Sequence, residues 1–139
     1  MQFAPVQEAE KFLADNPDIE MFELFILDAN GVPRGKLLHR DELLAVYKTG
    51  RPLPSTILGL TMNGDDVEDS GLVWEVGDID CRAYPLPGSL TRMPWRQIPT
   101  AAVQVSMHPT EGLPATVADP RHLLVQVCLL YTSDAADDS

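Results

Sequence analysis

The pattern of hydrophobic and polar positions divides the first part of the chain into a helix and a strand. Residues 5–15 carry apolar side chains at helical spacing, which predicts a short helix with one buried side. Asn16 and Pro17 end this helix, because a residue before proline avoids the α region. Residues 21–27 are apolar on both faces apart from Glu23, a pattern typical of a strand with neighbours on both sides.

The dipeptide Asn30-Gly31 between two apolar runs predicts a β-hairpin whose second strand is Val32–Leu38. A type I′ turn, with positive φ at both central residues, is the expected geometry. The returning strand carries Arg34 and Lys36 on one face. This pair either binds a phosphate or a carboxylate of a neighbouring subunit, or forms a solvated edge that discourages sheet-to-sheet aggregation.

The stretch HRDELLAVYKTG, residues 39–50, has the strongest helical pattern, with acidic residues at its start and Gly50 at its end. After the two prolines of RPLP, a short β-type run is expected over Thr56–Leu60. Further strands are expected over 71–76, 81–86 and 100–107. Several short strands that follow a hairpin and a helix indicate an α+β fold.

A last helix is expected to begin with Asp119 as its N-cap and Pro120 at its first helical position, and to run to Val127. The whole pattern predicts a β-grasp-like mixed sheet with one or two packed helices, although periodicity alone leaves other α+β topologies open. The sequence contains no internal repeats.

Composition narrows the classes of function. Hydrophobic residues make up 45% of the chain and the formal net charge is −11. The chain is therefore expected to fold, and it lacks the basic surface that nucleic acid or an anionic membrane requires. No apolar stretch approaches the ~20 residues of a membrane-spanning helix, so a cytoplasmic location is expected. Cys81 and Cys128 show neither metal-site spacing nor a disulfide framework.

No group of residues makes a self-sufficient active site. Four acidic residues crowd one polar loop, where they either bind a divalent cation or, as is more usual, are only solvated. These residues are Asp65, Asp66, Glu68 and Asp69. Asp78 and Asp80 share a strand face without a cleft around them, and the histidines are scattered at His39, His108 and His122. The chain is thus either a binding module or part of a larger protein.

Five segments in order carry a family resemblance: NPDIEMFELFILDANGVPRGKLLHRDELLAVYKTG, LPSTILGL, GDIDCRAYPLPGSL, MPW and ADPRHLL. Over about residues 9–127 the chain resembles the N-terminal part of the glutamine synthetase family, in particular its γ-glutamylpolyamine (γ-glutamylputrescine) synthetase branch. The resemblance implies an N-terminal β-grasp domain over 1–117. It also implies that 118–127 form the first helix of a truncated catalytic domain.

What the resemblance implies about activity is an ATP-dependent carboxylate–amine ligase that joins the glutamate γ-carboxylate to ammonia or to a polyamine. ATP and Mg²⁺ or Mn²⁺ would be bound by the full-length parent and not by this fragment alone, which contains no catalytic residue and no metal site. Members of the family are ring-stacked homo-oligomers, in which this domain of one subunit closes the substrate pocket of the next.

One loop, formed by Leu53, Pro54, Ser55 and Thr56, is the candidate contact with the neighbouring subunit's substrate pocket. Its prolines stiffen the backbone, and its two hydroxyls either contact a ligand or serve the turn alone. Ammonia-using members of the family carry an acidic residue at the place of Leu53, where a carboxylate helps to hold ammonium. The absence of that carboxylate favours a bulkier amine, such as a polyamine.

The segment 128–139, CLLYTSDAADDS, changes in character. From Cys128 through Asp137 it resembles the translation of a transposase adapter used in sequencing libraries, which implies a non-native tail. The alternative is a natural acidic tail. For the whole chain, the alternative to a ligase fragment is a stand-alone ubiquitin-like module that binds a protein partner without catalysis. A genomic read across the Val127–Cys128 junction distinguishes the two, because only the fragment requires continued coding sequence.

Overall fold

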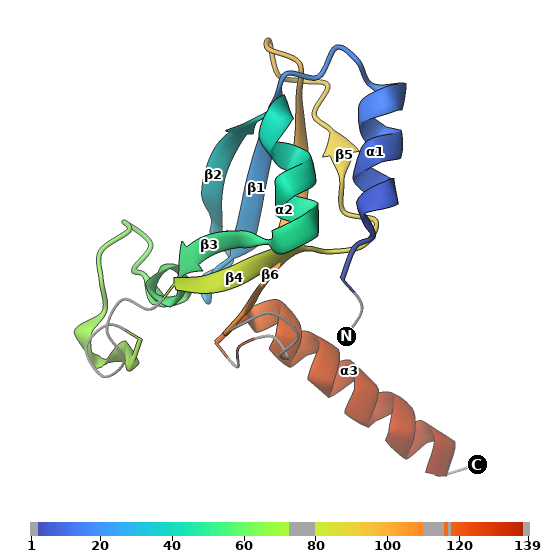
Figure 1. Ribbon diagram of the computed structural model, residues 1–139. Coiled ribbons are helices and arrows are strands. Elements are labelled where there is room, and N and C mark those ends of the chain that lie inside the picture. The colour runs from blue at the N-terminus through green and yellow to red at the C-terminus, as the bar shows by residue number, and fades with distance from the viewer. Residues whose placement is uncertain (1–2, 73–79, 110–115, 117, 138–139) are drawn as a thin grey trace.

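A six-stranded mixed sheet organises the chain, as the computed structural model in Figure 1 shows. The structure describes residues 3–72, 80–109, 116 and 118–137. The α-helices and strands are α1 (Val6–Asp15), β1 (Met21–Leu27), β2 (Pro33–His39), α2 (Leu43–Thr49), β3 (Arg51–Pro54), β4 (Asp80–Pro85), β5 (Thr91–Arg92), β6 (Thr100–His108) and α3 (Pro120–Asp137). The 3-10 turns are η1 (Arg40–Glu42), η2 (Ser55–Gly59) and η3 (Glu68–Ser70).

The strand order is β2-β1-β6-β4-β3, with β5 also paired to β6. The β1–β6 pair is parallel and the other pairs are antiparallel. β1 therefore has a neighbour on each side, as its two apolar faces predicted. The predicted α+β class with a mixed sheet is confirmed.

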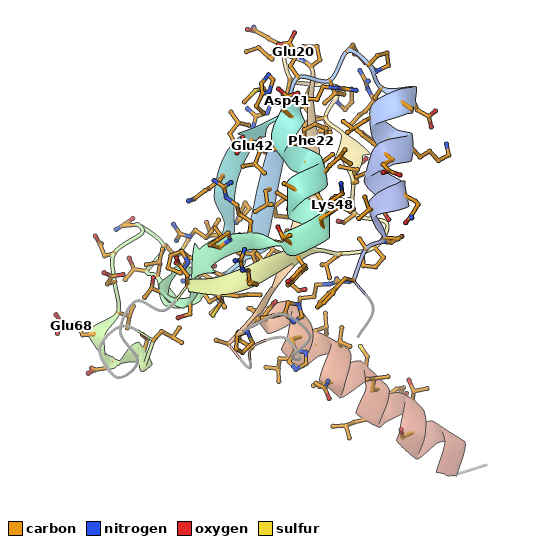
Figure 2. All side chains as sticks on the ribbon, in the orientation of Figure 1. Glu20, Phe22, Asp41, Glu42, Lys48 and Glu68 are labelled. Carbon is orange, nitrogen blue, oxygen red and sulfur yellow. The ribbon has the colours of Figure 1, made fainter. Side chains whose placement is uncertain are left out.

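The core lies between the sheet and the two helices α1 and α2, which Figure 1 shows side by side on one face. Along β1, Phe22, Leu24 and Ile26 are fully buried and alternate with half-buried residues. Phe22 points toward the helices, and its ring lies 6.1 Å from that of Phe12 (Figure 2). Burial of each such side chain stabilises the fold by about 2 kcal/mol.

The hairpin forms where it was predicted, but its turn differs from the expected type I′. Gly31 has a φ of +75°, and among the described residues only glycines have positive φ, so Asn30 does not. The Gly31 N–H donates to the Asp28 carbonyl at 3.0 Å, which makes a type I turn followed by a left-handed glycine. The Asp28 carboxylate explains the difference, because it accepts the N–H groups of Asn30 and Val32 and so fixes a longer loop.

The predicted helix over 39–50 begins with η1 and continues as α2. Gly50 ends it with a φ of +71°, and its N–H donates to the Val46 carbonyl. The glycine was therefore correctly identified as the terminator of this helix.

The β-type run expected over Thr56–Leu60 is wrong. Extended structure instead occupies the RPLP segment as β3, and the following residues form η2. β3 is an edge strand, so Pro52 and Pro54 can occupy alternate positions that donate nothing to β4. Leu58 is 1% exposed, and burying it by a tight turn outweighs the strand propensity of this run.

Helix α3 begins at Pro120, as predicted, and continues to Asp137, beyond the expected end at Val127. Figure 1 shows it projecting away from the sheet. Most of the strand expected over 71–76, together with Asp78 and the domain boundary at residue 117, lies outside the described residues. Among the helices that the structure describes, none is long and apolar enough to cross a membrane.

Gly35 is required by a close approach of two backbones, which generates the first prediction. A Cβ at this position would overlap the Leu24 carbonyl on the paired strand. We expect Gly35→Ala to lower the free energy of unfolding by about 3 kcal/mol, measured by urea denaturation. The exposed neighbour Lys36 is the control: Lys36→Ala should change stability by less than about 0.5 kcal/mol. Equal effects of the two substitutions would contradict the close approach.

Candidate functional site

The candidate pocket loop lies at the junction of β3 and η2. Leu53 and Pro54 end the strand, and Ser55 and Thr56 start the 3-10 turn. Leu53 is 2% exposed and packs in the core opposite Cys81. Ser55 is also buried, whereas Pro54 and Thr56 are half-buried. The backbone thus brings the four residues together, but Pro54 and Thr56 offer most of the side-chain surface. Their contact with a neighbouring pocket stays a prediction.

The segment that follows this loop is bound to the β1–β2 hairpin by three hydrogen bonds, in which backbone carbonyls of the segment are the acceptors. The Ala29 N–H donates to the Leu58 carbonyl at 3.3 Å. The Asn30 side-chain amide donates to the Leu60 carbonyl at 3.1 Å. The Arg34 guanidinium donates to a third carbonyl, that of Thr61, from Nη2 at 2.7 Å. The turn that follows the candidate loop is therefore held by the hairpin.

The Asp28 carboxylate holds two of the three donor residues, because it accepts hydrogen bonds from the Asn30 N–H and from Arg34. Its side chain is fully buried, and its Oδ2 lies 3.0 Å from Nε of Arg34. Burial alone would raise the pKa of this carboxyl, but the Val32 N–H, the Arg34 guanidinium and the Asn30 N–H together lower the pKa below its ordinary value. The carboxylate therefore stays charged and keeps the arginine in place.

Arg34 and Lys36, which the sequence places on one face of the returning strand, have different surroundings in the structure. Arg34 has a side chain 18% exposed and binds a carboxylate, but that carboxylate belongs to its own chain. Lys36 is exposed and makes no hydrogen bond or ion pair with the described residues. The partner of Arg34 was missed, although an aspartate two residues before Asn-Gly is a signal for a side chain that bonds to its own turn.

The junction between β6 and α3 is a second buried polar site. Asp119 is 1% exposed, and its Oδ1 accepts the Arg121 N–H at 3.0 Å, which confirms it as the predicted N-cap. Its Oδ2 accepts the Met107 N–H of β6 at 3.2 Å. On the same strand, Ser106 Oγ and His108 Nε2 are 2.7 Å apart and both side chains are buried. Asp119 thus fixes where the last helix leaves the sheet.

The remaining sequence candidates do not assemble into a site. The four acidic residues of the polar loop are exposed, and Figure 2 shows Glu68 pointing away from the sheet. Asp65 is bound within its own loop, where its N–H donates to the Thr61 hydroxyl. No group of three or more His, Cys, Asp or Glu side chains that could hold a metal ion occurs in the described part of the chain.

A groove of about 760 Å³ lies on the second face of β1, and it explains why this strand is apolar on both sides. Phe25, Leu27 and Leu37 line it, together with Trp95 from the segment after β5. The Trp95 side chain is 72% exposed. Most of this open face is apolar, although Glu23 and Lys36 also line the groove.

Known proteins resemble this chain both in sequence and in fold. No protein-family model matches the chain. Over 125 residues, the chain is 30% identical to the gamma-glutamylputrescine synthetase PuuA of Escherichia coli (strain K12). The match covers 85% of this chain and 25% of that protein, so the chain spans about a quarter of the length of the curated relative it matches.

Solved structures share the fold. A novel glutamine synthase homologue has a TM-score of 0.70 at 21% identity, covering 84% of this chain and 27% of its own. The GmaS/ADP complex has a TM-score of 0.63 at 22% identity, with 96% of this chain and 26% of its own covered. Glutamine synthetase of Plasmodium falciparum has a TM-score of 0.66 at 14% identity, with 96% and 24% covered. In each case the likeness is confined to about a quarter of the known structure.

The reactivity of the Cys81 thiol tests whether Leu53 of the candidate loop packs in the core, because the two residues lie opposite each other on β3 and β4. Cys81 is buried, and first burial and then the nearby Asp80 charge raise the pKa of its thiol. A raised pKa leaves less thiolate at a given pH, so we expect Cys81 to react with Ellman's reagent at least about tenfold more slowly than the exposed Cys128. The variant Cys128→Ser isolates Cys81, and urea should restore its reaction. Fast labelling of Cys81 in the folded variant would mean that Cys81 and Leu53 are not packed in the core.

Proposed function

Because this chain belongs to the glutamine synthetase family, we propose that it is the N-terminal, pocket-closing domain of an ATP-dependent carboxylate–amine ligase. The observation that carries the proposal is the 30% identity over 125 residues, which spans 85% of this chain but 25% of the relative. The fold likeness to members of the family covers the same fraction of their chains.

We further propose the division of the chain into three parts. Residues 1–117 form the β-grasp-type domain, 118–127 begin the catalytic domain, and 128–139 are a non-native tail. The contacts at the β6–α3 junction support a boundary near residue 117. The Thr116 N–H donates to the Met107 carbonyl at 2.8 Å, and Asp119 bonds to both β6 and α3.

In the parent enzyme, the proposed reaction is phosphorylation of the glutamate γ-carboxylate by ATP, followed by displacement of phosphate by an amine. Bound Mg²⁺ or Mn²⁺ would neutralise the charge that develops on the phosphoryl group. The described residues offer no cluster that fits such ions, so we assign the metal- and ATP-binding groups to the remainder of the parent. The role of this domain is to exclude water and to bound the amine site of the neighbouring subunit in a homo-oligomeric ring.

The loop over Leu53–Thr56 favours a polyamine over ammonia as the substrate. Leu53 occupies the place of the family's acidic residue, and its burial in the core leaves no carboxylate to hold an ammonium ion. Gamma-glutamylputrescine synthetase is the activity of the curated relative, which supports the same choice.

A second candidate is a binding module without catalysis, and the apolar groove on the open face of the sheet favours it. Such a module would be a stable monomer that recruits a protein partner through Trp95 and its apolar neighbours. The two functions differ in whether a catalytic domain follows Val127 in the gene.

One experiment tests the ligase proposal in two arms. The purified chain, incubated with glutamate, Mg²⁺-ATP and putrescine, should release no phosphate, because we assign the phosphoryl-transfer groups to the remainder of the parent. The full-length parent, recovered by a genomic read beyond Val127, should release phosphate with kcat/KM for putrescine at least about tenfold above that for ammonium. Turnover by the chain alone would contradict the fragment assignment, and a preference for ammonium would contradict the amine assignment.

A further inference from the structure

The turn that follows the candidate pocket loop depends on the hairpin for its shape. The carbonyls of Leu58, Leu60 and Thr61 all accept hydrogen bonds, and every donor comes from residues 29–34. Two of the three donors are side chains, so this contact is specified by residue type and not by strand pairing alone. The hairpin therefore sets the position of the loop from outside it.

Arg34 can connect the two segments because a guanidinium has N–H groups that point in different directions. Its Nε contacts the buried Asp28 carboxylate at 3.0 Å while its Nη2 reaches the Thr61 carbonyl at 2.7 Å. A lysine at this position carries all of its N–H donors on one nitrogen, so it lacks the planar fork that directs separate N–H groups at the two acceptors.

The carboxylate itself is held by the turn. Its Oδ1 accepts the N–H groups of Asn30 and Val32, each at 2.9 Å, which leaves Oδ2 for Arg34. The turn thus fixes the Asp28 carboxylate, the carboxylate fixes Arg34, and Arg34 binds the Thr61 carbonyl. Charge-assisted hydrogen bonds of this kind are roughly twice as strong as neutral ones.

We propose that Arg34, held by Asp28, is a positioning residue of the ligase. It fixes the segment 55–61 so that the preceding loop presents Pro54 and Thr56 to the amine pocket of the neighbouring subunit. This inference rests on the proposed function, because it takes the loop to be part of that pocket. It also explains why the returning strand of the hairpin carries an arginine, which the sequence alone left open.

The chain offers a matched pair of variants. Arg34→Lys keeps the positive charge beside Asp28 but removes the second contact, while Lys36→Arg makes the reverse exchange two residues along the same strand. Hydrogen–deuterium exchange of the 139-residue chain, followed by mass spectrometry, measures the loop directly. We expect exchange in peptides covering 55–64 to rise about tenfold in Arg34→Lys and to stay unchanged in Lys36→Arg.

Exchange in β6 is the internal control, since β6 makes none of these contacts, and it should be equal in all three proteins. If Arg34→Lys does not fold, Arg34→Gln replaces it, because the shorter amide removes the contact with the Thr61 carbonyl. Unchanged exchange over 55–64 in the folded variants would overturn the positioning role, whatever the function of the parent.

The second readout separates this inference from the proposed function. In the full-length parent, Arg34→Lys should raise KM for the amine about tenfold and leave KM for ATP unchanged, because the loop bounds the amine site alone. Lys36→Arg should change neither constant. A loosened loop with an unchanged amine KM would overturn the pocket role of the loop and, with it, the proposed function of Arg34 in the reaction.

Discussion

The pairing of β6 with its neighbours is the interaction on which the rest of the structure depends. β6 is buried along nearly its whole length and pairs with β1, β4 and β5. Its parallel pair with β1 joins the two ends of the domain in the sequence, so everything between them must fold as a crossover. At its end, the Met107 N–H is accepted by Asp119, which sets the start of α3. One central strand thus positions the hairpin, the β3 edge and the exit of the chain.

How much of this was predictable follows from which residues carry each feature. Local signals were sufficient for the apolar faces of β1, the Gly50 terminator and the Asp119 cap, since each is decided by neighbours within a few residues. The Arg34–Thr61 contact spans 27 positions, and no local pattern specifies a partner at that separation. The strand predicted over Thr56–Leu60 was wrong for the same reason, because burial of Leu58 against distant residues outweighs the local strand propensity of this run. The role of the loop over Leu53–Thr56 stays a prediction, and the burial of Leu53 was not visible in the sequence.

Surface area links the fold to the proposed place of this chain in a larger protein. Exposed apolar side chains lie on α3, including Leu123, Leu124 and Val127, and on the open face at Trp95. The exposure of these side chains supports the proposal that both surfaces are covered in the parent.

A domain that closes another subunit's pocket must present its loop with little freedom, because movement of the loop admits water and loosens the bound amine. Short edge strands and 3-10 turns are weak elements by themselves, and β3 with η2 is of this kind. The Asp28–Arg34 contact adds a polar restraint from the β1–β2 half of the sheet, at a place where Leu58 and the partly buried Ile57 supply the apolar packing of the turn. The hairpin thus restrains a weak edge of the sheet. Under the proposed function, selectivity for the amine would depend on Asp28 and Arg34, which do not themselves line the proposed loop.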